Sequence, residues 1–130
     1  MARVSIIMGI YNCAATLPEA IDSILTQTFL DWQLVLCDDG SKDNTFTVAK
    51  AYQEKFPNKI VLLQNEQNMG LNHTLNRCLQ AATGEYVARM DGDDVSLPSR
   101  LEKEVAFLDV HPEYAIVSTP MIFFDESGDW

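Results

Sequence analysis

Positive charge is scarce in this chain of 130 residues. Nine Lys and Arg residues stand against nineteen Asp and Glu residues, which gives a formal net charge of −10 at pH 7. Nucleic-acid binding depends on clustered Lys and Arg that contact phosphates, so this balance excludes a general nucleic-acid binder. An acidic protein still binds an anionic ligand when a metal ion supplies the missing positive charge.

Cysteine and histidine are also few. Cys13, Cys37 and Cys78 are odd in number, widely spaced and set in apolar stretches, which argues against a disulfide framework and predicts free thiols of a cytoplasmic protein. His73 and His111 have no second His or Cys at the spacing of a metal site, so we assign them no role.

Long apolar runs, repeats and flexible linkers are missing from the sequence. The apolar run after Met1 is too short to span a bilayer and has no signal-peptide cleavage site. No stretch rich in Pro, Gly or Ser separates two parts of the chain. We therefore expect residues 1–130 to form a single domain, with 47% apolar residues to build its core.

Apolar runs and amphipathic segments alternate along the chain. The apolar runs predict five strands, at residues 4–8, 32–37, 59–64, 86–90 and 114–119. The segments between them predict four helices, at residues 17–28, 44–56, 71–82 and 98–110. This alternation predicts an α/β fold, with a mostly parallel sheet and helices on both of its faces.

Side-chain patterns give expectations for individual elements. The stretch Thr16-Leu17-Pro18-Glu19 predicts a capping box at the start of the first helix. One apolar face of the third helix, which we expect to be buried, contains Leu71, Leu75, Cys78 and Leu79. Residues 86–88 predict the end of a buried strand, and Arg100 is expected to point outward from the fourth helix.

Aromatic and acidic residues follow three of the predicted strands. Tyr11 comes after the first strand, Asp38 and Asp39 follow the second, and an acidic knot at residues 91–94 follows the fourth. Ligands bind at the carboxyl ends of parallel strands, so we expect these residues along one edge of the sheet. Three carboxylates this close repel one another unless a cation lies between them, and oxygen ligands suit Mg²⁺ or Mn²⁺. A stacking ring, an acidic turn and a metal site together suit a nucleotide diphosphate.

Six ordered stretches form a pattern that covers essentially the whole chain. They are residues 4–12, 38–41, 68–71, 83–94, 97–102 and 111–112. In these stretches the chain resembles the family 2 glycosyltransferases, inverting nucleotide-sugar enzymes, and most of all the bacterial ones that build exopolysaccharide, lipopolysaccharide or capsule. The resemblance implies a Rossmann-like GT-A fold, the nucleotide-diphospho-sugar transferase fold.

The resemblance also implies roles for individual residues. Gly9, Tyr11, Asp39 and Asp91 would bind the nucleotide, with Tyr11 beside the base and Asp39 in contact with the base or the ribose. The stretch Asp91-Gly92-Asp93 matches the DXD motif of the family.

This motif implies a divalent cation, Mn²⁺ or Mg²⁺, as cofactor. Asp93 would contact the metal directly, Asp91 would face the ribose or the metal, and Asp94 would support the turn.

The chain departs from the family pattern at two positions and in length. Gly9 stands where many members have proline, and Leu75 stands where many have arginine, for which Arg77 is the nearest replacement. Family members continue into a second half that binds the acceptor and carries the catalytic base. We therefore expect a donor-binding part that is incomplete at its C-terminus, with the base beyond Trp130. The acidic residues before that point are expected in a charged hairpin turn: Asp125, Glu126 and Asp129.

The implied function is transfer of a sugar from a nucleotide-diphosphate donor, with UDP as the expected nucleotide, to a saccharide or lipid-linked acceptor. It implies a metal-dependent, inverting enzyme of surface polysaccharide synthesis, in the cytoplasm or at the cytoplasmic face of the membrane. For the full-length protein, peripheral membrane association and self-association into a homo-oligomer stay open. The donor-binding part alone is expected to lack sugar transfer, because transfer needs the base.

Other interpretations of the same residues stay open. The acidic knot is also compatible with a solvated turn, and Tyr11 with a residue at the edge of the core. Asp38 is expected to be structural, capping either its own turn or the helix that follows through an Asx-type bond. The alternative functions are a donor-binding module without turnover and a sugar nucleotidyltransferase, although residues 9–14 lack the Gly- and Arg-rich phosphate loop that the latter needs.

Overall fold

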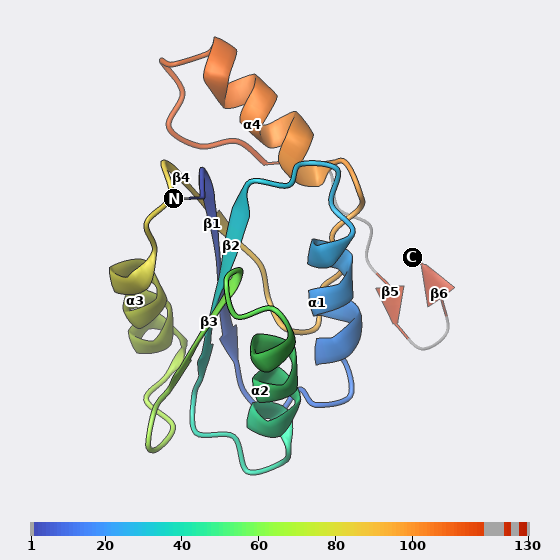
Figure 1. Ribbon diagram of the computed structural model, residues 1–130, viewed down its shortest axis with the longest axis vertical. Helices are drawn as coiled ribbons and strands as arrows, with labels where there is room; N and C mark the ends of the chain where they lie inside the picture. Colours follow the sequence, from blue (N-terminus) through green and yellow to red (C-terminus); the bar gives the residue numbers. More distant parts are fainter. Residues whose placement is uncertain (1, 119–123, 126–127, 130) are drawn as a thin grey trace.

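The computed structural model describes residues 2–118, 124–125 and 128–129, and it has an α/β fold (Figure 1). Strands and helices alternate up to α4, as the sequence predicts. The elements are β1 Val4–Ile10, α1 Leu17–Leu25, β2 Trp32–Asp38, α2 Thr45–Lys55, β3 Ile60–Gln64, α3 Leu71–Ala81, β4 Tyr86–Arg89, α4 Arg100–Val110, β5 Phe124–Asp125 and β6 Gly128–Asp129.

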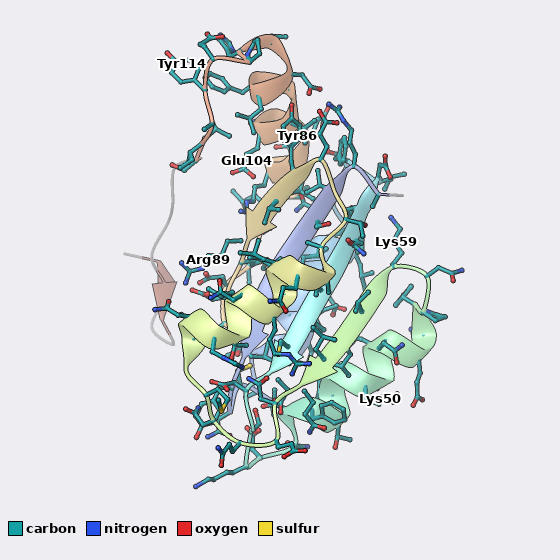
Figure 2. All side chains as sticks on the ribbon, turned by 90° about the vertical axis from the view of Figure 1, so that its left-hand side faces the viewer. Lys50, Lys59, Tyr86, Arg89, Glu104 and Tyr114 are labelled. Atoms are coloured by element: carbon teal, nitrogen blue, oxygen red, sulfur yellow. The ribbon has the colours of Figure 1, made fainter. Side chains whose placement is uncertain are left out.

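A four-stranded sheet forms the centre of the fold. Its order is β3-β2-β1-β4, and every neighbouring pair is parallel. β1 and β2 pair in register along their whole length, from Val4 beside Trp32 to Ile10 beside Asp38. β3 and β4 form the two edges, so Lys59 and Arg89 lie at opposite sides of the sheet (Figure 2). The predicted parallel sheet is thus confirmed.

Helices cover both faces of this sheet, with α1 and α2 on one face and α3 on the other (Figure 1). Successive side chains of a strand point to opposite faces, so a strand covered on both sides must be apolar throughout. Ile6 and Met8 of β1 belong to the same core as Ile21 of α1. Ile7, between them in the chain, packs instead with Cys78 of α3. This division explains the uninterrupted apolar run of β1.

The helix α4 lies near the N-terminal ends of the central strands (Figure 1). The Arg3 guanidinium forms an ion pair with Asp109 near the end of α4, and the Tyr86 hydroxyl donates a 2.7 Å hydrogen bond to the same carboxylate. Leu101 and Val105 of α4 are buried. Of the helices in the described part of the chain, none combines the length and the apolar character needed to cross a bilayer.

The predicted fifth strand at 114–119 is wrong for the described residues. Residues 114–118 are irregular, and residue 119 lies outside the described part. The Tyr114 N–H donates a 3.0 Å hydrogen bond to the His111 carbonyl, and the Tyr114 ring lies 5.6 Å from the Phe107 ring. Aromatic contacts therefore turn this segment back onto the end of α4.

The hairpin expected around Asp125 and Asp129 is confirmed for its backbone. β5 and β6 pair antiparallel, with Phe124 beside Asp129 and Asp125 beside Gly128. Glu126, which was expected in the same turn, lies outside the described residues.

One prediction about a buried face is wrong, and another is only partly right. β4 is an edge of the described sheet rather than a strand buried on both sides, and Val87 is 49% exposed. On α3, Cys78 of the predicted face is fully buried, but Leu71 and Leu79 are almost half exposed, and Thr74 takes a second fully buried position. The Thr74 hydroxyl donates to the Gly70 carbonyl at 2.9 Å, so burying it leaves no unpaired donor.

The first helix begins where predicted, but without the expected capping box. No side-chain bond caps its start; the Thr16 hydroxyl donates instead to the Gly92 carbonyl at 3.0 Å. The helix ends at Leu25, before the predicted residue 28, and the Thr28 N–H donates to the Pro98 carbonyl at 2.9 Å. Both ends of α1 are thus bonded to the segment between β4 and α4.

Candidate functional site

The carboxyl ends of β2, β1 and β4 lie next to one another, because these strands are parallel neighbours in the sheet (Figure 1). Ile10 at the end of β1 lies beside Asp38 at the end of β2, and Ile7 lies beside Arg89 at the end of β4. The loops that follow the three strands therefore meet at one edge, as the sequence predicts.

An open cleft of about 500 Å³ lies at this edge. The loop after β1, the start of α3 and the acidic loop after β4 form its walls. Its lining residues include Gly9, Tyr11, Asp43, Leu71, Asp91 and Asp93. Four of the six residues to which the resemblance assigns a role thus share one cleft. The other two, Asp39 and Asp94, are absent from the lining.

Tyr11 is 42% exposed at this cleft. The next residue, Asn12, has a φ of 47°, a left-handed conformation that asparagine adopts more readily than most residues. Its side-chain oxygen accepts a 2.8 Å hydrogen bond from the Lys42 N–H, and its own N–H donates to the Ser41 hydroxyl at 2.9 Å. These bonds hold the β1–α1 loop against the β2–α2 turn, which fixes the backbone that carries Tyr11.

Gly9 lies where β1 passes close to the start of α3. A Cβ atom at this position would lie 3.1 Å from Leu71 Cδ1 and 3.3 Å from Thr74 Cγ2. These distances are at the tight end of van der Waals contact, so a side chain here would push against α3. Glycine allows the close packing of β1 against this helix.

Asp39 is buried, with only 5% of its surface exposed. One carboxylate oxygen accepts hydrogen bonds from the Asn65 amide (2.9 Å) and the Met69 N–H (2.7 Å), and the other accepts from the Gly70 N–H (3.1 Å). Burial acts to raise the pKa of Asp39, but these hydrogen bonds outweigh it and hold the pKa below its usual value. The carboxylate is therefore ionised at neutral pH and joins the β2–α2 turn to the loop before α3.

Asp38 has the structural role that was expected for it. The side chain is fully buried, and its carboxylate accepts hydrogen bonds from the Ser41 hydroxyl (2.6 Å) and the Ser41 N–H (3.1 Å). Both bonds close the turn after β2, as an Asx-type turn does.

The acidic loop brings the carboxylate oxygens of Asp91, Asp93 and Asp94 within 4.8 Å of one another. Burial, and then the negative charges of Asp91 and Asp93, raise the pKa of Asp94. The ion pair from Arg89 to Asp91 spans 3.8 Å between exposed side chains, where screening by water leaves little attraction. Three hard oxygen ligands at this spacing fit Mg²⁺ or Mn²⁺.

Gly92 lets the acidic loop lie directly on the β1–α1 loop. A Cβ atom here would lie 2.8 Å from the Cys13 sulfur and 3.1 Å from Ile10 Cγ2, closer than packed atoms allow. The Thr16 hydroxyl holds the Gly92 carbonyl at 3.0 Å from the same side. The geometry of the acidic loop is therefore set partly by residues of the first loop.

The role of one polar residue in this region was not predicted from the sequence. Asn65 is buried and donates both to Asp39 and to the Thr74 hydroxyl. The only sequence signal was its position, directly after the third strand. Arg77, considered as a replacement phosphate ligand, instead donates to the Gln64 carbonyl (2.9 Å) and to Asn65 Oδ1 (2.8 Å). Its guanidinium thus holds the end of β3.

Comparisons with known proteins agree with one another. The family model described as glycosyl transferase family 2 matches residues 5–130. EpsE of Bacillus subtilis (strain 168), which is named as a glycosyltransferase, is 54% identical over 126 residues, covering 97% of this chain and 45% of EpsE.

Solved structures show the same similarity. S. aureus TarS 1-349 in complex with UDP-GlcNAc has a TM-score of 0.78 and 27% identity, covering 95% of this chain and 38% of that one. The mannosyltransferase PcManGT from Pyrobaculum calidifontis, in complex with GDP-Man and Mn²⁺, has a TM-score of 0.77 and 30% identity, covering 82% of this chain and 32% of that one. The chain spans less than half the length of each of these three proteins.

Proposed function

The chain belongs to glycosyl transferase family 2, and on that basis we propose that it binds a nucleotide-diphosphate sugar as the donor half of an inverting glycosyltransferase. The observation that carries this proposal is the cleft shared by Tyr11 and the acidic loop, at the carboxyl ends of parallel strands. A cleft in this position is where open α/β sheets bind nucleotides. An aromatic ring at one wall and paired carboxylates at the other match the two ends of such a donor.

The expected arrangement places the base beside Tyr11 and the diphosphate beside the acidic loop. The exposed Tyr11 ring offers a face on which a nucleobase stacks. Asp39 keeps unused acceptor capacity on the oxygen that receives only the Gly70 N–H, and there it could accept from a base N–H or a ribose hydroxyl. Because Asp39 is buried, this contact requires the loop at Met69 to shift when the donor binds.

We propose Mn²⁺ or Mg²⁺ as the cofactor of the acidic loop. Asp93 would hold the ion, with Asp91 shared between ion and ribose and Asp94 supporting the turn. A bound divalent cation would neutralise the charge that develops on the departing diphosphate. The protein's own contribution is to hold three carboxylates together on a fixed loop, so that little reorganisation is needed when the cation enters. The Mn²⁺ and GDP-Man in the PcManGT structure support this assignment.

For the whole protein we propose transfer to a saccharide or lipid-linked acceptor in surface polysaccharide synthesis, with UDP-sugar as the donor. UDP-GlcNAc in the TarS structure supports this choice of nucleotide, whereas GDP-Man in the PcManGT structure supports a GDP-sugar instead. The three cysteines are free thiols, which supports a reducing compartment such as the cytoplasm. Transfer also needs a base to deprotonate the acceptor hydroxyl, and we propose that this base lies beyond Trp130.

A thermal-shift series tests the donor proposal. UDP and GDP, each with Mn²⁺, Mg²⁺ or EDTA, are titrated against the chain. With metal, the preferred nucleotide at one hundred times its dissociation constant should add roughly 2.7 kcal/mol to the free energy of unfolding. With EDTA the same concentration should add clearly less. Equal shifts with metal and with EDTA would overturn the metal role, and no shift with any nucleotide would overturn donor binding.

A donor-binding module without turnover is the second candidate for this chain alone. It is favoured because the chain spans less than half of its relatives' length. The test compares sugar transfer by residues 1–130 with transfer by a form extended to the length of the relatives. We expect transfer only from the longer form; comparable rates from both would place the base within these residues.

A further inference from the structure

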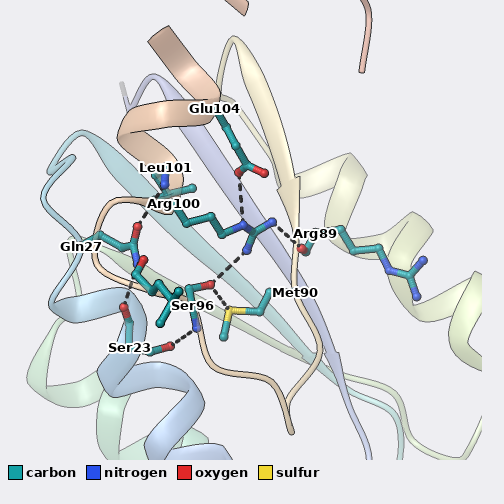
Figure 3. A network of polar contacts seen from close by, with 9 residues as sticks. Ser23, Gln27, Arg89, Met90, Ser96, Arg100, Leu101 and Glu104 are labelled. Carbon is teal, nitrogen blue, oxygen red and sulfur yellow. Dashed lines mark hydrogen bonds and ion pairs between the residues drawn. The ribbon is translucent and has the colours of Figure 1, made fainter. Parts of the chain in front are cut away.

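The guanidinium of Arg100 lies between the two ends of the acidic loop (Figure 3). One of its terminal nitrogens donates to the Arg89 carbonyl at 3.0 Å, and the other donates to the Ser96 hydroxyl at 3.1 Å. The third nitrogen forms a 3.2 Å ion pair with Glu104, one turn further along α4. The prediction that Arg100 points outward is therefore wrong.

These two acceptors bracket the acidic segment in the sequence. Arg89 ends β4 two residues before it, and Ser96 lies two residues after it, so one side chain ties the loop's entry to its exit. A planar guanidinium suits this task, because it presents several N–H groups in fixed directions. Lysine has a single charged nitrogen, and it would lose part of this geometry.

The exit of the loop is also held from the end of α1. The Ser96 N–H donates to the Ser23 hydroxyl at 3.0 Å, and the Gln27 amide donates to the Leu97 carbonyl at 2.8 Å (Figure 3). Gln27 then accepts from the Leu101 N–H at 3.1 Å. At the entry, the Met90 N–H donates to the Ile7 carbonyl at 3.1 Å. The Ser96 hydroxyl also donates to the Met90 sulfur at 3.3 Å, so Arg100 reinforces a direct contact between entry and exit.

The acidic segment needs such a constraint because its own charges push it apart. Carboxylates within 4.8 Å of one another repel strongly when all are ionised. Between Asp91 and Asp94 the loop has one turn bond, from the Asp94 N–H to the Asp91 carbonyl at 3.1 Å. A loop free to relax would spread its carboxylates and lose the spacing that a small cation requires.

We propose that Arg100 is a positioning residue for the acidic loop: by joining the Arg89 carbonyl to the Ser96 hydroxyl, it sets the carboxylate spacing for a divalent cation. This inference rests on the proposed metal site, but the joining of the loop is a property of the protein without metal. Glu104 orients the guanidinium from the other side, and its side chain is only 13% exposed.

The test uses Arg100→Lys and Arg100→Met, with Lys103→Met as the matched control, since Lys103 lies on the exposed side of the same helix. Ser96→Ala removes one of the two Arg100 acceptors together with the Ser96 contact to the Met90 sulfur, and it serves if the Arg100 variants fold poorly. Hydrogen exchange without metal is followed at the amides of residues 91–96, with β1 and β2 as internal references. Mn²⁺ binding is followed by electron paramagnetic resonance of the free ion, well below the melting temperature.

In Arg100→Met, exchange at the Asp94 amide should be roughly tenfold faster, as expected when hydrogen bonds from a charged group are lost, with β1 and β2 unchanged. The Mn²⁺ dissociation constant should rise roughly tenfold or more, the usual effect of removing a group that orients metal ligands. Arg100→Lys and Ser96→Ala should be intermediate, and Lys103→Met should match the parent.

Two results would overturn the inference: unchanged exchange in the acidic loop of both Arg100→Met and Ser96→Ala, or faster exchange spread evenly over the sheet. Faster exchange over the whole sheet is what we expect if Arg100 only stabilises the fold as a whole. If the parent protein takes up no Mn²⁺, the proposed metal site fails, while the exchange comparison still decides whether Arg100 positions the loop.

Discussion

The Asn65 amide donates a 2.9 Å hydrogen bond to the Asp39 carboxylate, in the interior and across 26 residues of sequence. The same nitrogen donates to the Thr74 hydroxyl at 3.0 Å, and the Asn65 oxygen accepts from Arg77 at 2.8 Å. One side chain thus joins the ends of β2 and β3 to α3. Asp39 is consequently both a candidate ligand for the nucleotide and a part of the core.

Asp39→Asn should therefore lower stability as well as nucleotide binding. The folded-state pKa of Asp39 lies below its unfolded value, so the carboxylate contributes stability above the unfolded pKa of about 4 and loses it as the pH falls through the folded value. At pH 7 the free energy of unfolding of the variant should be about 2 kcal/mol lower than that of the parent. The reason is that the amide nitrogen of asparagine would replace a carboxylate oxygen that accepts a hydrogen bond from an N–H group.

Urea unfolding at pH 7, 5 and 3 measures this difference. The difference in the free energy of unfolding between parent and variant should be present at pH 7 and pH 5 and smaller at pH 3. Asp31→Asn, at an exposed aspartate, is the control and should leave the unfolding free energy unchanged. A gap of constant size across the three pH values would contradict the assigned pKa shift.

Asp93→Ala should remove the metal dependence of nucleotide binding and leave the fold intact. Asp93 is exposed, and its charge repels Asp91 and Asp94, so its loss should keep or slightly raise the melting temperature without metal. Glu54→Ala on α2 removes one exposed negative charge away from the cleft and controls for net charge. Isothermal titration calorimetry with Mn²⁺ and nucleotide measures the binding of both. If Asp93→Ala binds them as Glu54→Ala does, the assignment of Asp93 as a metal ligand is wrong.

Tyr11→Ala should weaken nucleotide binding roughly tenfold or more, since stacking of a base on an aromatic ring contributes about 1–3 kcal/mol. The melting temperature should change little, because the ring is 42% exposed. Tyr11→Phe keeps the ring and should bind like the parent. Loss of affinity in Tyr11→Phe as well would show that the hydroxyl, rather than the ring face, makes the contact.

Gly92→Ala should destabilise the protein by about 1–3 kcal/mol, the usual cost of overpacking. The added methyl group would lie 2.8 Å from the Cys13 sulfur. Cys13→Ala removes this sulfur, so the double variant should recover part of the loss. Chemical unfolding of the two single variants and the double variant forms a complete cycle, and purely additive effects would place the strain elsewhere.

The sequence was sufficient for those elements whose pattern reflects local physics. The run from Val4 to Met8 is apolar at every position, so a strand covered on both faces followed directly. The face of α3 was misjudged because Thr74 is polar; its hydroxyl is satisfied by Gly70 and Asn65, and only the folded structure brings Asn65 there. The strand expected from Tyr114 onward was wrong because aromatic contacts with Phe107 outweigh strand propensity.

The candidate site shows the same division. Order along the chain and the rule that strand ends meet were enough to bring Tyr11, Asp91 and Asp93 to one cleft. Neither rule showed that Asp39 would be buried beneath the loop at Met69, or that Arg100 would turn inward to Arg89 and Ser96. Those contacts join residues far apart in the sequence or need a particular rotamer, and single-sequence patterns carry no signal for either.

The position of β1 inside the sheet determines when the cleft exists during protein synthesis. Val4 pairs with Trp32 on one side and with Tyr86 on the other, and the ribosome delivers these partners at very different times. Domains form N-terminal parts first as the chain emerges. The wall that carries Tyr11 can therefore be assembled with β2 and β3 while the acidic loop is still inside the ribosome. Until β4 arrives, one long edge of β1 has no partner strand, so the nascent chain depends on this last pairing both to cover that edge and to complete its cleft.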